Sequence, residues 1–141
     1  MIEGERMATF LRLLEPDNPG WLITLEKRAL KERVPIIRPQ IQSLLRFLLV
    51  QSRPRAVLEV GTAVGFSTLF MSEYLPPEGH ITTIEKCESR IEEAKRHFRE
   101  FGRESRITLL EGDAAVCLRR LRGPFDFIFM DCAKVQYVKY L

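Results

Sequence analysis

The sequence has few of the residues that would place it in an oxidising compartment or a membrane. Its only cysteines are Cys87, Cys117 and Cys132, an odd number with no Cys-x-x-Cys spacing. We therefore expect reduced thiols in a cytoplasmic protein rather than a disulfide framework. No apolar run approaches about 18 residues and no charged-then-apolar leader opens the chain. We expect neither a membrane span nor a secretion signal.

The chain also lacks a strong charge of either sign. Lys and Arg number 22 against 19 Asp and Glu, for a net charge of +3. An excess this small permits an anionic partner without requiring one, and it is more typical of a solvated surface. With 141 residues, 45% of them hydrophobic, the chain can bury a core of about one ordinary domain.

The first 54 residues have the spacing of helices. Apolar residues predict a short helix over 5–14, and the Pro and Gly residues of 16–20 end it. A second helical pattern runs from Trp21 to Leu30, and Pro39 suits the first position of a third helix. We interpret 1–54 as an N-terminal helical segment for substrate or dimer contacts, and 55–141 as a separate half-domain.

Strands and helices alternate from residue 55 onward. We predict strands at 56–60, 81–85, 106–111 and 125–131, with helices at 67–74, 89–100 and 114–121 between them. This alternation is typical of an α/β fold with right-handed crossovers and a parallel sheet. The continuous apolar run 127–130 predicts a strand that is covered on both faces.

A glycine turn follows the first predicted strand. Gly61 and Gly65 are four positions apart, and Phe66 stands where the G-x-G-x-x-G fingerprint of dinucleotide-binding proteins has its third glycine. A bulky ring there prevents the close helix–strand packing that this glycine allows, so an NAD-dependent oxidoreductase fits poorly. A turn that approaches a small amino-acid group fits better. The glycine pair alone would favour an ordinary βα turn.

Carboxylates follow the ends of the later strands. Glu85 ends the second strand, where it would accept hydrogen bonds from both ribose hydroxyls, or is simply a surface Glu. Asp113 suits either the N-cap of the next helix or a contact to an adenine amine. Asp131 and Lys134 form either an ion pair or a hard-cation ligand beside a general base. Such an ordered series is far rarer by chance than any one of its members.

Together these residues resemble the metal-dependent class I O-methyltransferases, the caffeoyl-CoA and catechol group. The matching pieces are LEVGTAVGFS at 58–67, TIE at 83–85, GDA at 112–114, and 125–134 with Tyr137. The bacterial branch that includes tRNA 5-hydroxyuridine methyltransferase is the most similar, through the VPII segment at 34–37 and its spacing to the turn. The resemblance covers roughly residue 20 to the end and implies a Rossmann-like fold.

The resemblance implies S-adenosylmethionine as methyl donor and Mg²⁺ as divalent cation. The residues it places at the cofactor are Glu59, Ile37 through its backbone, Gly61 and Ser67 at the methionine part, Glu85 at the ribose, Asp113 and Ala114 at the adenine, and Asp131. Asp131 also resembles the first metal ligand. Lys134 resembles the general base that deprotonates the acceptor hydroxyl.

The same resemblance indicates what this chain would lack. The family sheet has strand order 3-2-1-4-5-7-6, and its remaining metal ligands are an Asp-Asn pair after the fifth strand. The four predicted strands form a partial sheet of order 3-2-1-4, and the sequence ends at Leu141. We therefore expect a C-terminally truncated chain with an incomplete metal site. Its fourth strand would be an open edge that favours a homo-oligomer.

The methyl acceptor stays open between two hydroxyl-bearing classes. One is the wobble 5-hydroxyuridine of tRNA, and the other is a small catechol-like or acyl-CoA phenol. A set of basic side chains would give RNA an approach surface or is merely solvated: Arg28, Lys31, Arg33, Arg38, Arg53 and Arg55. A module that binds the cofactor without catalysis is the alternative from a different class.

Overall fold

The computed structural model describes residues 2–131, so the predictions for Cys132, Lys134 and Tyr137 lie outside the described residues. Three helices come first: α1 (Ile2–Leu13), α2 (Gly20–Lys31) and α3 (Pro39–Ser52). The alternating part follows as β1 (Ala56–Val60), α4 (Phe66–Tyr74), β2 (His80–Glu85), α5 (Glu88–Glu100), the 3-10 turn η1 (Glu104–Arg106), β3 (Ile107–Glu111), α6 (Ala114–Arg120) and β4 (Phe127–Met130). The predicted elements are all present, with boundaries shifted by up to three residues.

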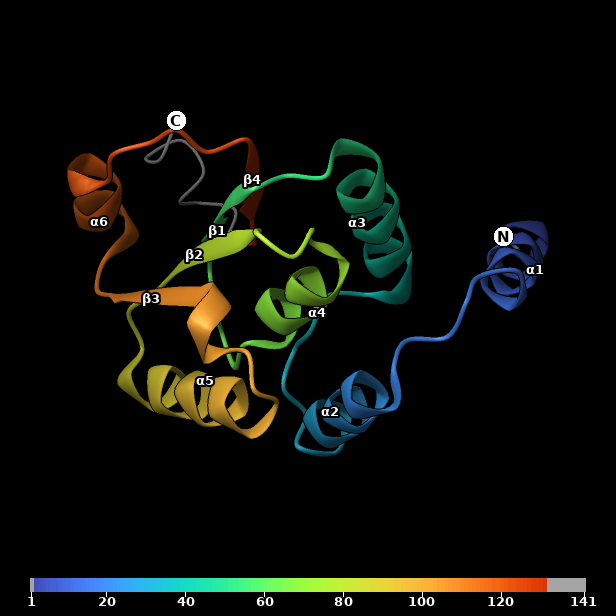
Figure 1. Cartoon of the computed structure of the whole chain (residues 1–141). Coiled ribbons are helices and arrows are strands. Elements are labelled where there is room, and N and C mark those ends of the chain that lie inside the picture. Colours follow the sequence, from blue (N-terminus) through green and yellow to red (C-terminus); the bar gives the residue numbers. More distant parts are fainter. Residues whose placement is uncertain (1, 132–141) are drawn as a thin grey trace.

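The strands form one parallel sheet of order β3-β2-β1-β4, as predicted (Figure 1). β1 is central, with Val57 in register with Ile81 on one side and with Phe127 on the other. The carboxylate of Asp126 accepts hydrogen bonds from the backbone N–H groups of Arg55 and Ala56, both at 2.9 Å. This clamp fixes where β4 begins along β1.

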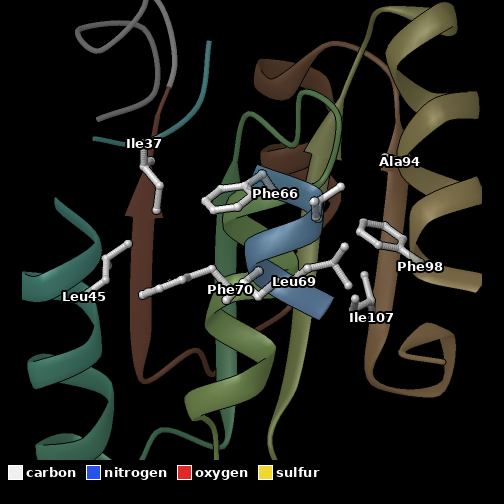
Figure 2. Close-up of a cluster of buried hydrophobic side chains, with 10 residues drawn as sticks. Ile37, Leu45, Phe66, Leu69, Phe70, Ala94, Phe98 and Ile107 are labelled. Carbon is white, nitrogen blue, oxygen red and sulfur yellow. The ribbon is translucent and has the colours of Figure 1, made fainter. Parts of the chain in front are cut away.

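Helices cover the two faces of the sheet unequally. On one face, α2, α3, α4 and α5 share a core whose buried members are Leu22, Leu25, Ile37, Leu45, Phe66, Leu69, Phe70, Ala94, Phe98 and Ile107 (Figure 2). On the other face, Ala114 of α6 packs with Leu58, Val60 and Ile84. Phe66, which stands at the third glycine position of the dinucleotide-binding fingerprint, is buried in the larger core, so its ring serves to pack the helices against the sheet.

The prediction that β4 is covered on both faces is wrong. Phe127 and Phe129 are half-buried against the larger core, but the side chain of Ile128 is 59% exposed. Within residues 2–131 only the short helix α6 lies on that face, and β4 has a neighbour along one edge only. An apolar run reports hydrophobicity, not how many elements cover it.

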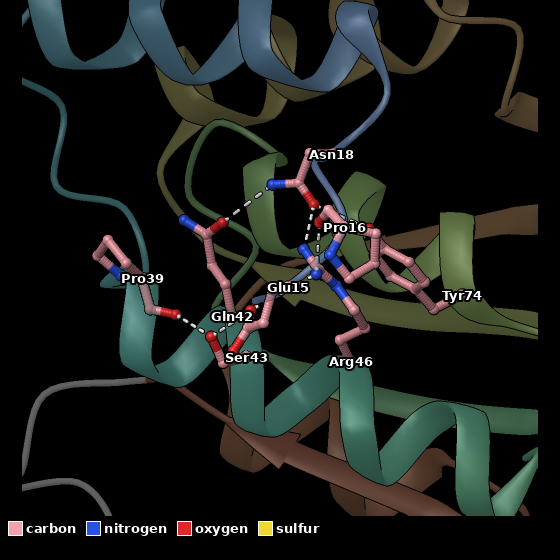
Figure 3. Close-up of polar contacts among 8 residues, drawn as sticks. All are labelled: Glu15, Pro16, Asn18, Pro39, Gln42, Ser43, Arg46 and Tyr74. Carbon is pink, nitrogen blue, oxygen red and sulfur yellow. Dashed lines mark hydrogen bonds and ion pairs between the residues drawn. The ribbon is translucent and has the colours of Figure 1, made fainter. Parts of the chain in front are cut away.

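A polar network attaches the segment after α1 to α3 (Figure 3). Ser43 Oγ donates to Glu15 at 2.8 Å, and the guanidinium of Arg46 donates to Pro16 O at 2.9 Å and to Asn18 Oδ1 at 2.7 Å. Tyr74 of α4 donates to the same Asn18 oxygen at 2.8 Å. α1 itself stands apart from the sheet in Figure 1. No helix within the described residues is long and apolar enough to cross a membrane.

Candidate functional site

The glycine turn between β1 and α4 has an unusual backbone. Gly61, Ala63 and Gly65 all have positive φ, at 102°, 47° and 87°. Gly61 N–H and Thr62 N–H both donate to Ile84 O, at 3.0 and 3.2 Å, which binds the turn to β2. A Cβ at Gly65 would lie 2.7 Å from the ring of Phe98. Glycine is therefore required at 65 by conformation and by space, whereas Ala63 adopts a glycine-like conformation despite its Cβ.

Glu85 is the last residue of β2, as predicted, and its carboxylate joins two parts of the site. Oε2 accepts from Ala63 N–H at 2.9 Å, and Oε1 accepts from the N–H groups of Lys86 and Cys87, both at 3.0 Å. The residue is 8% exposed. A carboxylate offers about four acceptor positions, so a ribose bound here would share this group with the backbone.

Glu59 lies within the sheet, beneath α4. It is fully buried, and its carboxylate accepts hydrogen bonds from Ser67 Oγ, Thr68 Oγ1 and, at 2.6 Å, Thr83 Oγ1. Burial raises the pKa of Glu59, the three hydroxyls oppose that shift, and the nearby charge of Asp131 adds to it. Glu59 and Ser67 are thus brought together, with the Ser67 hydroxyl directed at Glu59.

Sequence reasoning missed Thr68 and Thr83 in this cluster. A signal was available for one of them, because Thr83 is the cross-strand partner of Glu59 in a parallel register. A buried carboxylate needs hydroxyl or N–H donors around it, and a threonine within an apolar strand beside it is a natural donor.

The residues predicted at the adenine lie next to Glu85. Gly112 N–H donates to Glu85 O at 2.8 Å, and Asp113 Oδ1 accepts from Ala115 N–H at 2.9 Å. Asp113 is therefore the N-cap of α6, which confirms that alternative, and its contact to adenine stays a prediction. Ala114 is buried against the sheet.

The remaining site residues lie on the β4 side. Asp131 directly follows β4, its N–H donates to Val60 O at 3.0 Å, and its side chain is exposed. Ile37 packs in the larger core cluster (Figure 2), and its carbonyl accepts from Gln42 Nε2 at 3.1 Å. Phe127 and Phe129 of β4 pack against the same cluster. Lys134 lies outside the described residues, so its position relative to Asp131 stays a prediction.

The site as described gathers carboxylate side chains at one edge of the sheet. The glycine turn, Glu85, Asp113 and Asp131 all lie at the carboxyl ends of neighbouring parallel strands, where open α/β sheets bind ligands. Between residues 2 and 131 there is no group of three or more His, Cys, Asp or Glu side chains that could hold a metal.

Comparison with known proteins identifies the class. The sequence profile of the O-methyltransferase family matches residues 17–141, so this chain belongs to the O-methyltransferase family. Among its relatives are the O-methyltransferase ankF of Aspergillus thermomutatus, 37% identical over 95% of this chain, and a catechol O-methyltransferase of Niastella koreensis, 31% identical over 74%. Those matches cover 55% and 49% of the two relatives, so the chain spans about half their length.

A solved structure agrees with the observed fold. The S-adenosylhomocysteine-bound Podospora anserina methyltransferase PaMTH1 superposes with a TM-score of 0.89 at 26% identity, over 98% of this chain and 61% of that one. The Rossmann-like methyltransferase fold that the sequence predicted is thereby confirmed. The family resemblance is confirmed as far as the O-methyltransferase family with its catechol-type members.

Proposed function

We propose that this chain binds S-adenosylmethionine and provides the donor-binding half of an O-methyltransferase for small phenols. One observation carries the proposal: the glycine turn and the Glu85 carboxylate are joined by a 2.9 Å hydrogen bond at the carboxyl end of a parallel sheet. Family membership and the S-adenosylhomocysteine in the PaMTH1 structure support it.

The described residues have the chemistry that this donor needs. Glu85 offers a nearly buried acceptor to ribose hydroxyls, and Asp113 offers an exposed one at the neighbouring strand end. The first N–H groups of α4 follow Gly65, and the N-terminus of a helix favours a carboxylate such as that of methionine. The donor supplies an electrophilic methyl group on a sulfonium. The main task of the chain is to align it, a contribution of up to about 7–11 kcal/mol in well-oriented systems.

Calorimetry with S-adenosylhomocysteine tests the donor site. We expect the wild-type chain to bind and Glu85→Gln to bind at least about tenfold more weakly, because an amide replaces the charged acceptor. Glu111→Gln is the matched control. Glu111 ends the neighbouring strand β3 in register with Glu85, but it is exposed and pairs with Lys95 at 2.6 Å. Equal affinities of Glu85→Gln and wild type would refute the site, as would a wild type that does not bind.

A small phenol is the acceptor that we propose over tRNA. Of the basic side chains that would approach RNA, Arg28 forms a two-fold hydrogen-bonded pair with Glu100 at 2.8 and 2.9 Å, and Arg55 pairs with Glu78 at 3.3 Å. The Niastella relative is named a catechol O-methyltransferase. Deleting the gene is expected to leave methoxyuridine in bulk tRNA unchanged. Loss of methoxyuridine from bulk tRNA after the deletion would instead show that tRNA is the acceptor.

We base dependence on a divalent cation, with Lys134 as general base, on the sequence resemblance alone. EDTA is expected to leave the affinity for S-adenosylhomocysteine unchanged and to remove methyl transfer, with Mg²⁺ restoring it. Lys134→Met is expected to have the same selective effect. Transfer that persists in EDTA would contradict cation dependence, and binding without transfer under all conditions would favour a non-catalytic module.

Self-association is proposed through α1 and the outer side of α3. Met7, Phe10 and Leu13 of α1 are more than half exposed, as are Leu44 and Phe47 of α3. A lone helix of 12 residues is marginal in water, so packing its apolar side onto a second copy would stabilise it. Light scattering should show a dimer in the wild type and a shift to monomer in Phe47→Glu. Gln40→Glu, which adds the same charge at an exposed polar position of α3, should leave the dimer intact. A monomeric wild type would exclude this association.

A further inference from the structure

The last turns of α5 pack directly against the glycine turn. His97 Nδ1 lies 2.8 Å from the carbonyl oxygen of Val64, inside the turn, and His97 is 2% exposed. The next residue, Phe98, fills the space behind Gly65, where a Cβ would lie 2.7 Å from its ring. Packing against α5 therefore determines the shape of the turn, together with the turn's own backbone hydrogen bonds.

The hydrogen-bonding chemistry fixes the tautomer of His97. A carbonyl oxygen only accepts, so the proton must be on Nδ1. In the neutral ring, Nε2 then carries the lone pair, and this atom is buried without a hydrogen-bond partner among the described residues. Buried polar atoms are seldom left unpaired, and each exception calls for an explanation. A hydrophobic residue would fill the same space without this cost but would not hold Val64.

We propose that His97 is a positioning residue for the methyl-donor site. Its Nδ1–H bond to Val64 O holds the turn in the shape in which Ala63 N–H reaches the carboxylate of Glu85. The inference rests on the proposed function, in which the turn and Glu85 bind the donor. Helix α5 meets the site at both ends, because Glu85 also accepts from Cys87 N–H, directly before the helix begins. Helix α5 thus sets the distance between the glycine turn and Glu85, the two sides of the site.

Two substitutions of the same shape separate this role from a packing role. Asn and Leu branch alike at Cγ, and an Asn amide nitrogen takes the place of Nδ1, so His97→Asn retains the donor and His97→Leu removes it. We expect His97→Asn to bind S-adenosylhomocysteine within about twofold of wild type. His97→Leu should bind roughly 2- to 12-fold more weakly, which is the range for one lost hydrogen bond.

We expect the two variants to rank in the opposite order for stability and for affinity, so the comparison separates a positioning role from a packing role. Leu is the better helix former and the more hydrophobic side chain, so His97→Leu is expected to unfold at a higher urea concentration than His97→Asn. If His97 had a purely structural role, the more stable of the two variants would also bind S-adenosylhomocysteine more tightly. Equal binding by His97→Leu and wild type would overturn the proposal, as would equally weak binding by both variants.

Two further measurements do not depend on ligand. Amide exchange at Ala63 and Gly65 should become faster in His97→Leu and stay slow in His97→Asn, with Gly79 N–H, a turn amide bonded to Pro76 O at 2.8 Å, as the unchanged control. Nitrogen NMR of the wild type should show the Nδ1–H tautomer at His97, with His80 as the other histidine of the chain. An Nε2–H tautomer would refute the bond to Val64. If the wild type failed to bind S-adenosylhomocysteine, the proposed function would fall, and the exchange pattern would still decide the role of His97.

Discussion

Replacing Gly65 by alanine tests how the turn is built. Gly65 has φ +87°, and a residue with a Cβ in the left-handed region costs about 1–2 kcal/mol. The new Cβ would also lie 2.7 Å from Phe98 Cε1 and 3.4 Å from Ala94 Cβ. Because Phe98 is only 4% exposed, its ring must move within a packed core, and such overpacking costs about 1–3 kcal/mol. We expect Gly65→Ala to lower the free energy of unfolding by about 2–5 kcal/mol.

Urea unfolding of a matched pair separates the two contributions. Gly102 also has a positive φ, +63°, but a Cβ there would meet no atom within 4 Å. Gly102→Ala should therefore lose only the conformational part, and the difference between the variants measures the contact with Phe98. In a Phe98→Leu background the cost of Gly65→Ala should shrink, because the smaller side chain makes room. If Gly65→Ala cost no more than Gly102→Ala, the reasoning about close packing would be refuted.

Three further predictions concern stability. Burial raises the pKa of Glu59, so its carboxyl group stays protonated to higher pH in the folded chain than in the unfolded chain. The stability of the wild type relative to Glu59→Gln should therefore fall as pH rises from about 4 toward the raised folded pKa. A difference in free energy of unfolding that does not change with pH would contradict this. The backbone N–H groups of Arg55 and Ala56 lower the pKa of Asp126. In acid unfolding curves, the wild type should therefore be more stable than Asp126→Asn above about pH 4, and this extra stability should be lost as pH falls through the depressed pKa. Ala63→Gly should raise the free energy of unfolding by about 0.5–1 kcal/mol, because it relieves a φ of 47° at a residue with a Cβ; a loss of stability in urea would show that no strain is stored there.

The sheet was predictable because its signals are local. β1, β3 and β4 are short, mainly apolar runs followed by a glycine or an acidic residue, β2 ends on Glu85 itself, and alternation with helices fixes a parallel arrangement. Glu85 and Asp131 were found at strand ends for the same reason. These features depend only on the order of residues along the chain, which is the information that a sequence pattern contains.

Other features of the site depend on contacts between distant segments. The pairing of Ser67 with Glu59 requires α4 to lie over β1, whereas the family resemblance placed Ser67 only at the methionine part of the cofactor. The partial exposure of β4 depends on which elements lie beside it. His97 had no visible signal, because a histidine within a helical pattern of charged residues looks like a surface position until α5 is placed against the turn.

The clamp of Asp126 on β1 also has a consequence for the order of folding. It joins residues 70 and 71 positions apart, whereas the bond between Glu59 and Thr83 that links β1 to β2 spans 24. Closing a longer loop costs more chain entropy, and pairings between distant segments slow folding. The three strands β1, β2 and β3 are thus expected to assemble first, with β4 docking afterwards. In kinetic experiments, Asp126→Asn should speed unfolding and leave the folding rate nearly unchanged. When β4 docks last, Asp131 joins the carboxyl edge of the sheet beside β1 only in the final step of folding.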